Sequence, residues 1–338
     1  MRFSKPVNLF ASVLVLTGTA AQAEPIKVNV MNYIAAQTAM QFATYQKQAG
    51  GVNTVLNERE PVPVDNQPTI RMNRDTLYSF IVVDISEGAT VTLPDAGSRY
   101  RSMMVVNEAN YINAVYLGAG AHELTKEKFG SDHVWVGIRT LVDSNAPADI
   151  KAVHELQDGI KVEAGSANPF VAKDYDQASY KATLDSLLEL GKGVPDSTGW
   201  FGSKDDTTPI GHLIGTAVGF GGLPQKHAFY LNVNPDLPVG EYQLTAKDVP
   251  VKAFWSVSLY NDKGYFQKNP QDAYNFNSVN AKKNEDGSIT IHFGGCDDGR
   301  VNCLPIMDGW NYGVRLYEPE QAILDGSYVF PSVEKVSK

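Results

Sequence analysis

Polar side chains concentrate at residues 71–79, which read RMNRDTLYS and run directly into the apolar segment 80–83. A buried polar group must be hydrogen-bonded within the protein or to a ligand. Guanidinium groups suit anions in particular, because they donate several hydrogen bonds from one rigid plane. We therefore expect a small anionic or carbonyl-bearing ligand here. The predicted ligand-binding residues are Arg71, Asn73, Arg74 and Tyr78, with Arg315 and Tyr260 from later in the chain.

Two further residues of this kind are expected to be structural. Arg139 lies in the middle of an apolar run, between Ile138 and Thr140, so its charge needs a carboxylate, carbonyl groups or a ligand anion. We expect Asp75, or alternatively Asp84, to pair with Arg139 in a buried network. No pattern in the sequence identifies a catalytic residue.

Residues 253–260 alternate between two kinds of side chain, as a β-strand does. Trp255 shares its side with Val257 and Leu259, which predicts the core face. The opposite side carries aromatic and hydroxyl groups, and these could line a pocket or form a polar contact between domains. That side consists of Phe254, Ser256, Ser258 and Tyr260.

Known catalytic and metal motifs are missing. The chain has no G-x-S-x-G nucleophile elbow, which argues against the α/β-hydrolase fold but not against other hydrolases. None of the six histidines is spaced as H-x-H or H-E-x-x-H. We expect neither a metal ion nor a cofactor.

Cys296 and Cys303 are the only cysteines. An even, closely spaced pair predicts a disulfide in an oxidising compartment, and the spacing fits neither C-x-x-C nor a zinc site well.

The first 23 residues predict a secretory signal peptide: a basic start, a short apolar run and Ala21-Gln22-Ala23 before the cleavage point. We expect a periplasmic or secreted protein with no integral membrane segment after cleavage. The formal net charge of −9, without a basic block, argues against nucleic acid as a partner. The oligomeric state is left open.

Short strands with turns between them dominate the pattern, with helical periodicity at 32–48, 148–156, 176–190 and 209–218. The predicted fold is mainly β within the α+β class: two antiparallel β-sandwich or jelly-roll-like domains with a helical segment between them. After the signal peptide (1–23) we expect an N-terminal β-rich domain (24–165), a helical connecting segment (166–225) and a C-terminal β-sandwich domain (226–338).

Several short motifs resemble two bacterial domain families of unknown function. Four of them resemble DUF1254: Asn73-Arg-Asp-Thr-Leu-Tyr-Ser79, Leu93-Pro94-Asp95, Arg99-Tyr100 and Leu156-Gln157-Asp158. Four later ones resemble its usual companion, DUF1214: residues 254–260, Asn302-Cys303-Leu304-Pro305, Arg315-Leu316-Tyr317 before Pro319, and Leu324-Asp325-Gly326. Cys303 and Tyr328 stand where tryptophan is common in that family, and the cysteine pair suggests an exported branch.

The resemblance implies a β-rich two-domain protein and no established activity, although members are sometimes labelled carboxylesterase. Whether the protein is an enzyme is therefore left open. The first hypothesis is a hydrolase acting on a small carbonyl-bearing or anionic substrate in a cleft between the domains. The alternative is a periplasmic ligand-binding or envelope-associated protein without chemistry. A third is a purely structural role for the polar cluster.

Overall fold

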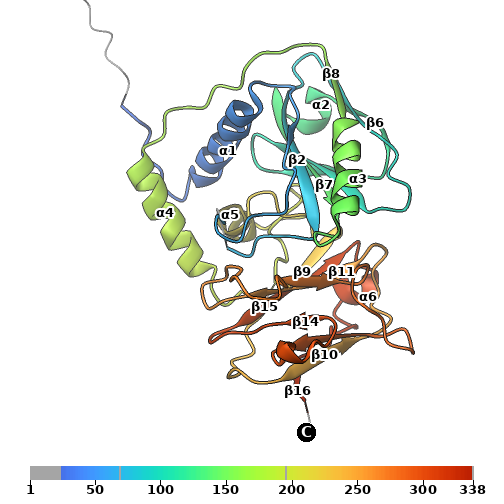
Figure 1. Cartoon of the computed structure of the whole chain (residues 1–338). Coiled ribbons are helices and arrows are strands. Elements are labelled where there is room, and N and C mark those ends of the chain that lie inside the picture. The colour runs from blue at the N-terminus through green and yellow to red at the C-terminus, as the bar shows by residue number, and fades with distance from the viewer. Residues whose placement is uncertain (1–23, 68–69, 195, 337–338) are drawn as a thin grey trace, which may run out of the picture.

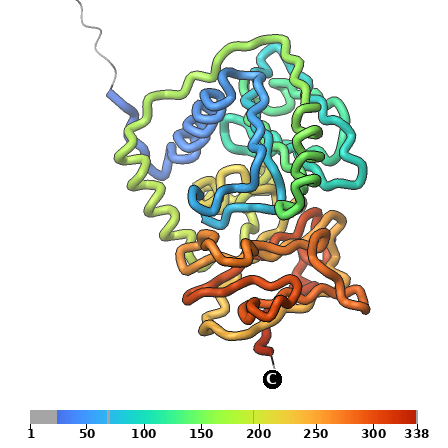
Figure 2. The backbone as a smooth tube through the Cα atoms, viewed as in Figure 1, coloured from blue at the N-terminus to red at the C-terminus, as the bar shows by residue number. Residues whose placement is uncertain are grey.

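The structure is a computed structural model that describes residues 24–67, 70–194 and 196–336. Its backbone forms two β-rich bodies with helices along one side of the first (Figures 1 and 2). The predicted signal peptide lies outside the described residues. Within them, no helix has the length and apolar character needed to cross a membrane.

The N-terminal body is a sandwich of two sheets. The larger sheet has the order β1 (Leu56–Asn57), β2 (Thr76–Asp84), β7 (His133–Leu141), β4 (Arg101–Asn107), β5 (Ile112–Leu117). The smaller has the order β6 (Gly120–Leu124), β3 (Ala89–Leu93), β8 (Lys161–Ala164). Side chains alternate along each strand, so one face of the larger sheet packs on the smaller sheet around fully buried Ile81, Val91 and Met103. The short helices α2 (Lys126–Phe129) and α3 (Pro147–Asp158) complete this body.

Three helices cover the side of this body: α1 (Tyr33–Ala49), α4 (Gln177–Leu190) and α5 (Pro209–Val218). Their inward residues form a core of their own around Tyr33, Leu187 and Ile214. Helix α1 also places Phe42 against the second face of the larger sheet. Gly50 ends α1 in the left-handed conformation, and Asp176 caps the start of α4 through the backbone N–H of Ser179.

The C-terminal body is a second sandwich, drawn from yellow to red in Figure 2. One sheet has the order β12 (Asn275–Asn277), β11 (Trp255–Tyr260), β15 (Asn311–Tyr317), β9 (Ala228–Val233). The other has the order β14 (Cys303–Leu304), β13 (Ile289–Phe293), β10 (Tyr242–Ala246), β16 (Glu334–Lys335). The 3-10 turn η1 (Cys296–Asp298) and helix α6 (Gln321–Leu324) lie in its connections.

The predicted fold class is confirmed: the protein is mainly β, with several antiparallel sheets and few helices. The pairing of β13 with β14 is parallel and is the exception among the paired strands described. Trp255, Val257 and Leu259 lie in the C-terminal core, as the alternation of residues 253–260 predicts. Their opposite face therefore turns toward the N-terminal body, which brings the two sets of polar residues together.

Candidate functional site

A row of three side chains crosses the larger N-terminal sheet. Arg139 of β7 is paired with Tyr78 of β2 on one side and with Ser102 of β4 on the other. Directly paired residues project from the same face of a sheet, so these three side chains are neighbours. They lie on the face turned away from the smaller sheet.

A second row crosses the facing C-terminal sheet. Its register aligns Asn277, Ser256, Arg315 and Tyr230 on strands β12, β11, β15 and β9. Three of the four, Asn277, Ser256 and Arg315, are buried at 7 % exposure or less. We call the residues where the two rows meet the interdomain network: Asn73, Asp75, Tyr78, Arg139, Ser256, Asn275, Asn277, Arg315 and Tyr317.

Asp75 is the centre of this network and is fully buried. Its carboxylate accepts hydrogen bonds from Ser256 Oγ at 2.6 Å, Asn275 Nδ2 at 2.8 Å and Asn277 Nδ2 at 3.4 Å. Burial raises the pKa of Asp75, while the positive charge of Arg315 opposes that shift. One carboxylate of the N-terminal body is thus held by three side chains of the C-terminal body.

The expected pairing of Asp75 with Arg139 is wrong, because the two residues take separate partners. The Asp75 carboxylate accepts hydrogen bonds from side chains of the C-terminal sheet. Arg139 Nη2 instead donates to the backbone carbonyl of Gly221. The alternative partner, Asp84, accepts instead from Ser86 and Asn168. Strand register explains why the two residues have different partners. Arg139 projects from the face of the larger N-terminal sheet, while Asp75 directly precedes β2 at the end of that strand.

Arg315 of the C-terminal body also joins the two bodies. Its guanidinium donates to Ser258 Oγ and Tyr260 OH within its own sheet, each at 2.8 Å. It also donates to the carbonyl oxygens of Arg71 and Met72 at 2.8 and 3.0 Å. Both predicted ligand-binding residues of this sheet, Arg315 and Tyr260, therefore have protein partners and stabilise the interface.

The remaining residues of the 71–79 segment divide between network and periphery. Asn73 Nδ2 lies 3.1 Å from Thr76 Oγ1, 3.1 Å from Tyr78 OH and 3.2 Å from Tyr317 OH, and its two hydrogens can serve two of these at a time. Arg74 donates to the carbonyl of Val62 and lies over the Tyr274 ring at 5.0 Å.

Arg71 has a left-handed φ of 53°, so the backbone is not extended at this residue. Its guanidinium lies 5.6 Å from the Tyr260 ring centre. Burial lowers the pKa of both Arg71 and Arg74. These two arginines lie apart from the row that contains Arg139.

Arg139 is enclosed by aromatic rings. Its guanidinium lies 5.4 Å from the centre of the Tyr78 ring, and Tyr100, Tyr230 and Tyr317 surround it further. Burial alone would raise the pKa of Tyr78, but the charge of Arg139 and the hydrogen bond from Asn73 lower it below the usual 10.0. Across the described part of the chain, no carboxylate lies within ion-pair distance of Arg139.

A cleft of about 660 Å³ opens beside this network, between the two sandwiches. Tyr100 and Phe254 lie in it with ring centres 5.3 Å apart, one from each body. Exposed Leu117 and Val279 supply apolar surface from opposite sides. Its charged residues are Arg99, Arg101, Asp143, Asp149, Lys252 and Glu318. None of the six predicted ligand-binding residues lines this cleft, although Asn277 of the network does.

No pattern in the sequence predicted that these residues line a cleft. The Arg99 guanidinium donates two hydrogen bonds to the Asp149 carboxylate, with Nη1–Oδ2 and Nη2–Oδ1 distances of 2.9 and 2.5 Å. Arg101 is different: it is 2 % exposed, and all three of its guanidinium nitrogens lack a hydrogen-bond partner among the described residues. The available signal was the pair of arginines around a tyrosine directly before an apolar strand, Arg99-Tyr100-Arg101.

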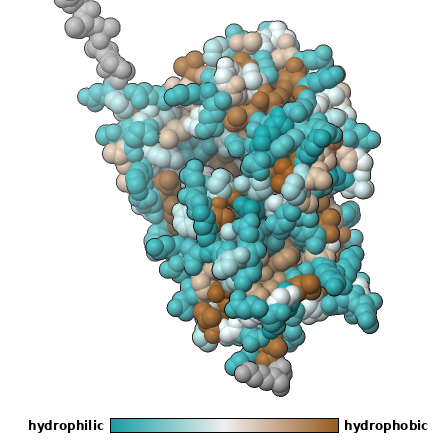
Figure 3. Space-filling view, in the orientation of Figure 1, coloured by the Kyte–Doolittle hydropathy of each residue, from teal (hydrophilic) through white to brown (hydrophobic). Residues whose placement is uncertain are grey.

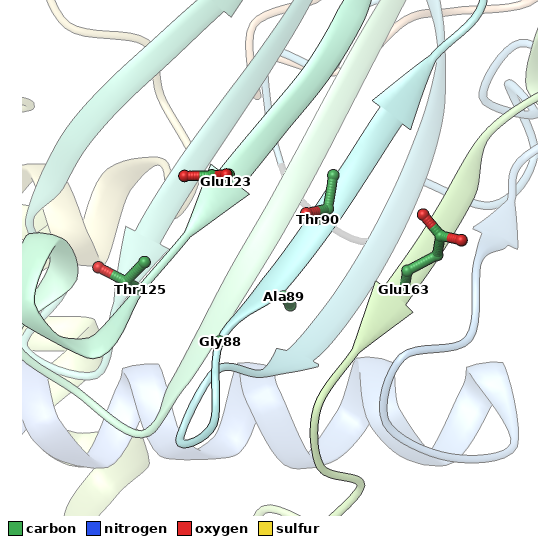
Figure 4. A pocket seen from close by; sticks show the side chains of 6 residues that line it. All are labelled: Gly88, Ala89, Thr90, Glu123, Thr125 and Glu163. Carbon is green, nitrogen blue, oxygen red and sulfur yellow. The ribbon is translucent and has the colours of Figure 1, made fainter.

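A second hollow, of about 260 Å³, lies on the smaller N-terminal sheet (Figure 4). Glu123 and Glu163 flank Thr90 on neighbouring strands there. Two carboxylates on an open sheet surface have too few ligands for a calcium site. Throughout the described ranges, no group of three or more His, Cys, Asp or Glu side chains is arranged to hold a metal ion.

The two cysteines form a disulfide, Cys296–Cys303, as predicted. It closes the turn that contains η1 and lies far along the chain from the network and cleft residues of the N-terminal body. The face shown in Figure 3 is mainly hydrophilic, and its apolar residues form separate small patches.

Comparison with known families supports the resemblance drawn from the motifs. Residues 52–129 match the family described as protein of unknown function DUF1254, and residues 235–321 match protein of unknown function DUF1214. The two matched regions each contribute to the interdomain network, through Asp75 and Arg315.

Two solved structures of bacterial proteins have a similar fold. The VPA0106 protein from Vibrio parahaemolyticus is 19% identical, with a TM-score of 0.67 over 91% of this chain and 98% of that one. An uncharacterised protein from Burkholderia cenocepacia is 14% identical, with a TM-score of 0.51 over 90% of this chain and 88% of that one. A search of curated proteins finds no match to the chain.

Proposed function

The chain is a protein with DUF1254 and DUF1214 domains of unknown function, and we propose that it binds a small molecule in the cleft between its two β-sandwiches. The observation that carries this proposal is the cleft itself. Its volume of about 660 Å³ is within the range of small-molecule sites, and its walls come from both bodies.

The lining indicates what kind of molecule would fit. Leu117 and Val279 at the rim, with Phe254 deeper in, favour an apolar or aromatic body. Lys252 and Arg101, whose guanidinium has no partner among the described residues, favour a polar end that is anionic or carbonyl-bearing, because each can donate hydrogen bonds to oxygen. The ligand class is therefore a small, partly apolar anion or carbonyl compound.

Benzoate and benzamide are suitable probes, because they share an aromatic ring and differ in charge. Isothermal titration should give saturable binding of at least one of them. Val279→Trp should block the cleft and abolish that binding with little change in stability, since Val279 is an exposed side chain. Val329→Trp is the matched control, because Val329 is also exposed and does not line the cleft. Binding that survives Val279→Trp would place the ligand elsewhere.

A specific observation favours hydrolysis as the second candidate function. His227 Nδ1 lies 2.9 Å from Glu318 Oε1, and Glu318 lines the cleft. A carboxylate that orients a histidine forms the base half of a hydrolytic triad. Ser98 also lines the cleft, but no hydrogen bond connects it to His227 in the described structure.

Turnover of p-nitrophenyl acetate separates the two functions. A binding protein should show no hydrolysis above that in buffer. A hydrolase should show turnover that His227→Asn abolishes and that Ser98→Ala also abolishes if Ser98 is the nucleophile.

We propose an exported location as well. The Cys296–Cys303 disulfide supports it, because disulfides persist in oxidising compartments such as the periplasm. Fractionation of cells that produce the full chain, followed by intact mass measurement, tests this directly. A mature protein beginning at Glu24 in the periplasm or medium is the expected result, and a reduced cytosolic protein would contradict it.

A further inference from the structure

We propose that Arg139, Ser102 and Tyr100 form a binding site for the carboxylate of a small monoanion, set behind the interdomain cleft. The inference rests on the proposed function only for its route of access, because Tyr100 also lines the cleft. Beyond the proposed function, the inference names the groups that bind the ligand and predicts that the ligand carries one negative charge.

Hydrogen-bonding groups without partners converge at this point. Arg139 Nη1, Ser102 Oγ and Tyr100 OH are all buried and have no hydrogen-bond partner within the described ranges. Burial raises the pKa of Tyr100, and the Ser102 hydroxyl opposes that shift, which places the two hydroxyls near each other. Since leaving a buried donor unpaired destabilises a protein by about 1–3 kcal/mol, three such groups together indicate a missing acceptor.

Strand register explains why the three groups face one point. Ser102 is the direct cross-strand neighbour of Arg139, and Tyr100 precedes Ser102 by two residues on the same side of the chain. Trp135 projects from the same face of β7, four residues before Arg139. A Cβ on Gly137 would lie 2.5 Å from the Trp135 ring, so this glycine gives the indole room to lie over the strand. Trp135 Nε1 is a fourth buried donor without a described partner.

The charge of the site favours a single negative charge. Arg139 is 6 % exposed and has no described carboxylate within ion-pair distance. One buried positive charge is balanced by a monoanion, whereas a phosphate dianion would leave a buried negative charge uncompensated. A planar carboxylate also matches the guanidinium geometry.

Aromatic walls define the rest of the site. The ring centre of Tyr100 lies 5.3 Å from the ring centres of both Phe254 and Tyr317. The ring centres of Tyr45 and Trp135 are 5.4 Å apart. Tyr78, Tyr100 and Tyr230 each keep some accessible surface although they lie between the two sheets. These walls suit a small aliphatic or aromatic carboxylate.

Titration with acetate and benzoate, each compared with its neutral amide, tests the proposal. The first readout is the ionisation of Tyr78, followed by tyrosinate absorbance: a bound carboxylate cancels the charge of Arg139 and should move that ionisation to higher pH. Acetamide and benzamide should not move it. The second readout is affinity, measured from the change in tryptophan fluorescence that is lost in Trp135→Phe.

Ser102→Ala is the decisive variant, because it removes a hydroxyl that has no described partner and should leave the fold intact. It should weaken carboxylate binding about tenfold, as loss of a hydrogen bond to a charged group does, and affect the amides little. Arg139→Lys should weaken it further. Ser197→Ala is the matched control, because Ser197 Oγ is also buried without a described partner but belongs to neither this site nor the cleft.

Three results would overturn the assignment. Carboxylate affinity that is unchanged in Ser102→Ala would mean that water satisfies the three groups. Equal weakening in Ser102→Ala and Ser197→Ala would mean that the loss of binding does not come from this site. Binding to the cleft without any shift of Tyr78 ionisation would contradict this inference while leaving the proposed function intact. Conversely, a Tyr78 shift that persists in Val279→Trp would support the anion site without the cleft.

Discussion

Arg139 lies directly across the β2–β7 pair from Tyr78, with its guanidinium 5.4 Å from the centre of the phenol ring. A buried positive charge beside a phenol favours the ionised form of that phenol. The pair therefore connects the charge of the interdomain surface with a group whose ionisation can be followed by spectroscopy.

The first prediction concerns Tyr78. Because its pKa lies below 10.0 in the folded protein, one tyrosine should ionise at lower pH than the others, and Tyr78→Phe should remove that phase. A folded-state pKa below the unfolded value means that ionisation adds stability. Above pH 10 the native protein should therefore be more stable than Tyr78→Phe by the full contribution of this ionisation. That extra stability should be lost as the pH falls through the lowered pKa of Tyr78.

Absorbance titration and urea unfolding at matched pH values provide the measurements. A titration curve that is unchanged in Tyr78→Phe would show that Arg139 does not act on this phenol.

The second prediction compares two arginines. Arg315→Ala should destabilise the protein by about 3–5 kcal/mol, because it leaves buried partners on both bodies without their donor. Arg74→Ala should cost only about 1–2 kcal/mol, the value of one hydrogen bond and one cation–π contact. Urea unfolding of both variants measures the difference. Equal losses would mean that Arg74 is as important to the interface as Arg315.

The third prediction concerns Asp75. In Asp75→Asn the new amide would present a donor to Asn275 and Asn277, which themselves donate to this position. We expect a loss of about 1–3 kcal/mol in the free energy of unfolding. Ser79→Ala removes one hydrogen bond from the same strand region and serves as a comparison, with a loss of about 1 kcal/mol. An Asp75→Asn protein as stable as the native sequence would contradict the central role given to this carboxylate.

The fourth prediction concerns the disulfide. Free-thiol labelling of the native protein should detect no reactive cysteine until a reductant is added. Cys303→Ser should lower stability by roughly 2–3 kcal/mol through the loss of a short closed loop. It should leave benzoate binding unchanged, since neither cysteine lines the cleft. Two thiols that react before reduction would show that the bond does not form.

Local patterns were sufficient to predict most of the fold. The apolar run 80–83 lies within β2, and the alternation around Trp255 correctly separated the C-terminal core face from the interface face. Helix α4 begins after Asp176, where the sequence predicts it. The short strands β1, β12, β14 and β16 were not predicted, because two or three residues carry too little periodicity.

The site was predicted less well, because contacts between distant segments depend on register. The segment 71–79 does enter a polar network. However, the partners of its Asp75, Ser256 and Asn275, follow Asp75 by 181 and 200 residues. The pairing of Asp75 with Arg139 failed for the same reason, as nothing local shows which sheet face Arg139 occupies. The cleft was missed because its lining comes from strands and loops of both bodies that are distant in the sequence.

Methyl NMR can test, residue by residue, whether the cleft between the sandwiches holds a small molecule. Leu117 and Val279 carry methyl groups in the cleft, while Val171 and Val329 are exposed outside it. Addition of benzoate or benzamide should shift the Leu117 and Val279 signals in a saturable way and leave those of Val171 and Val329 unchanged. Shifts that are absent, or equal at all four positions, would contradict binding in the cleft.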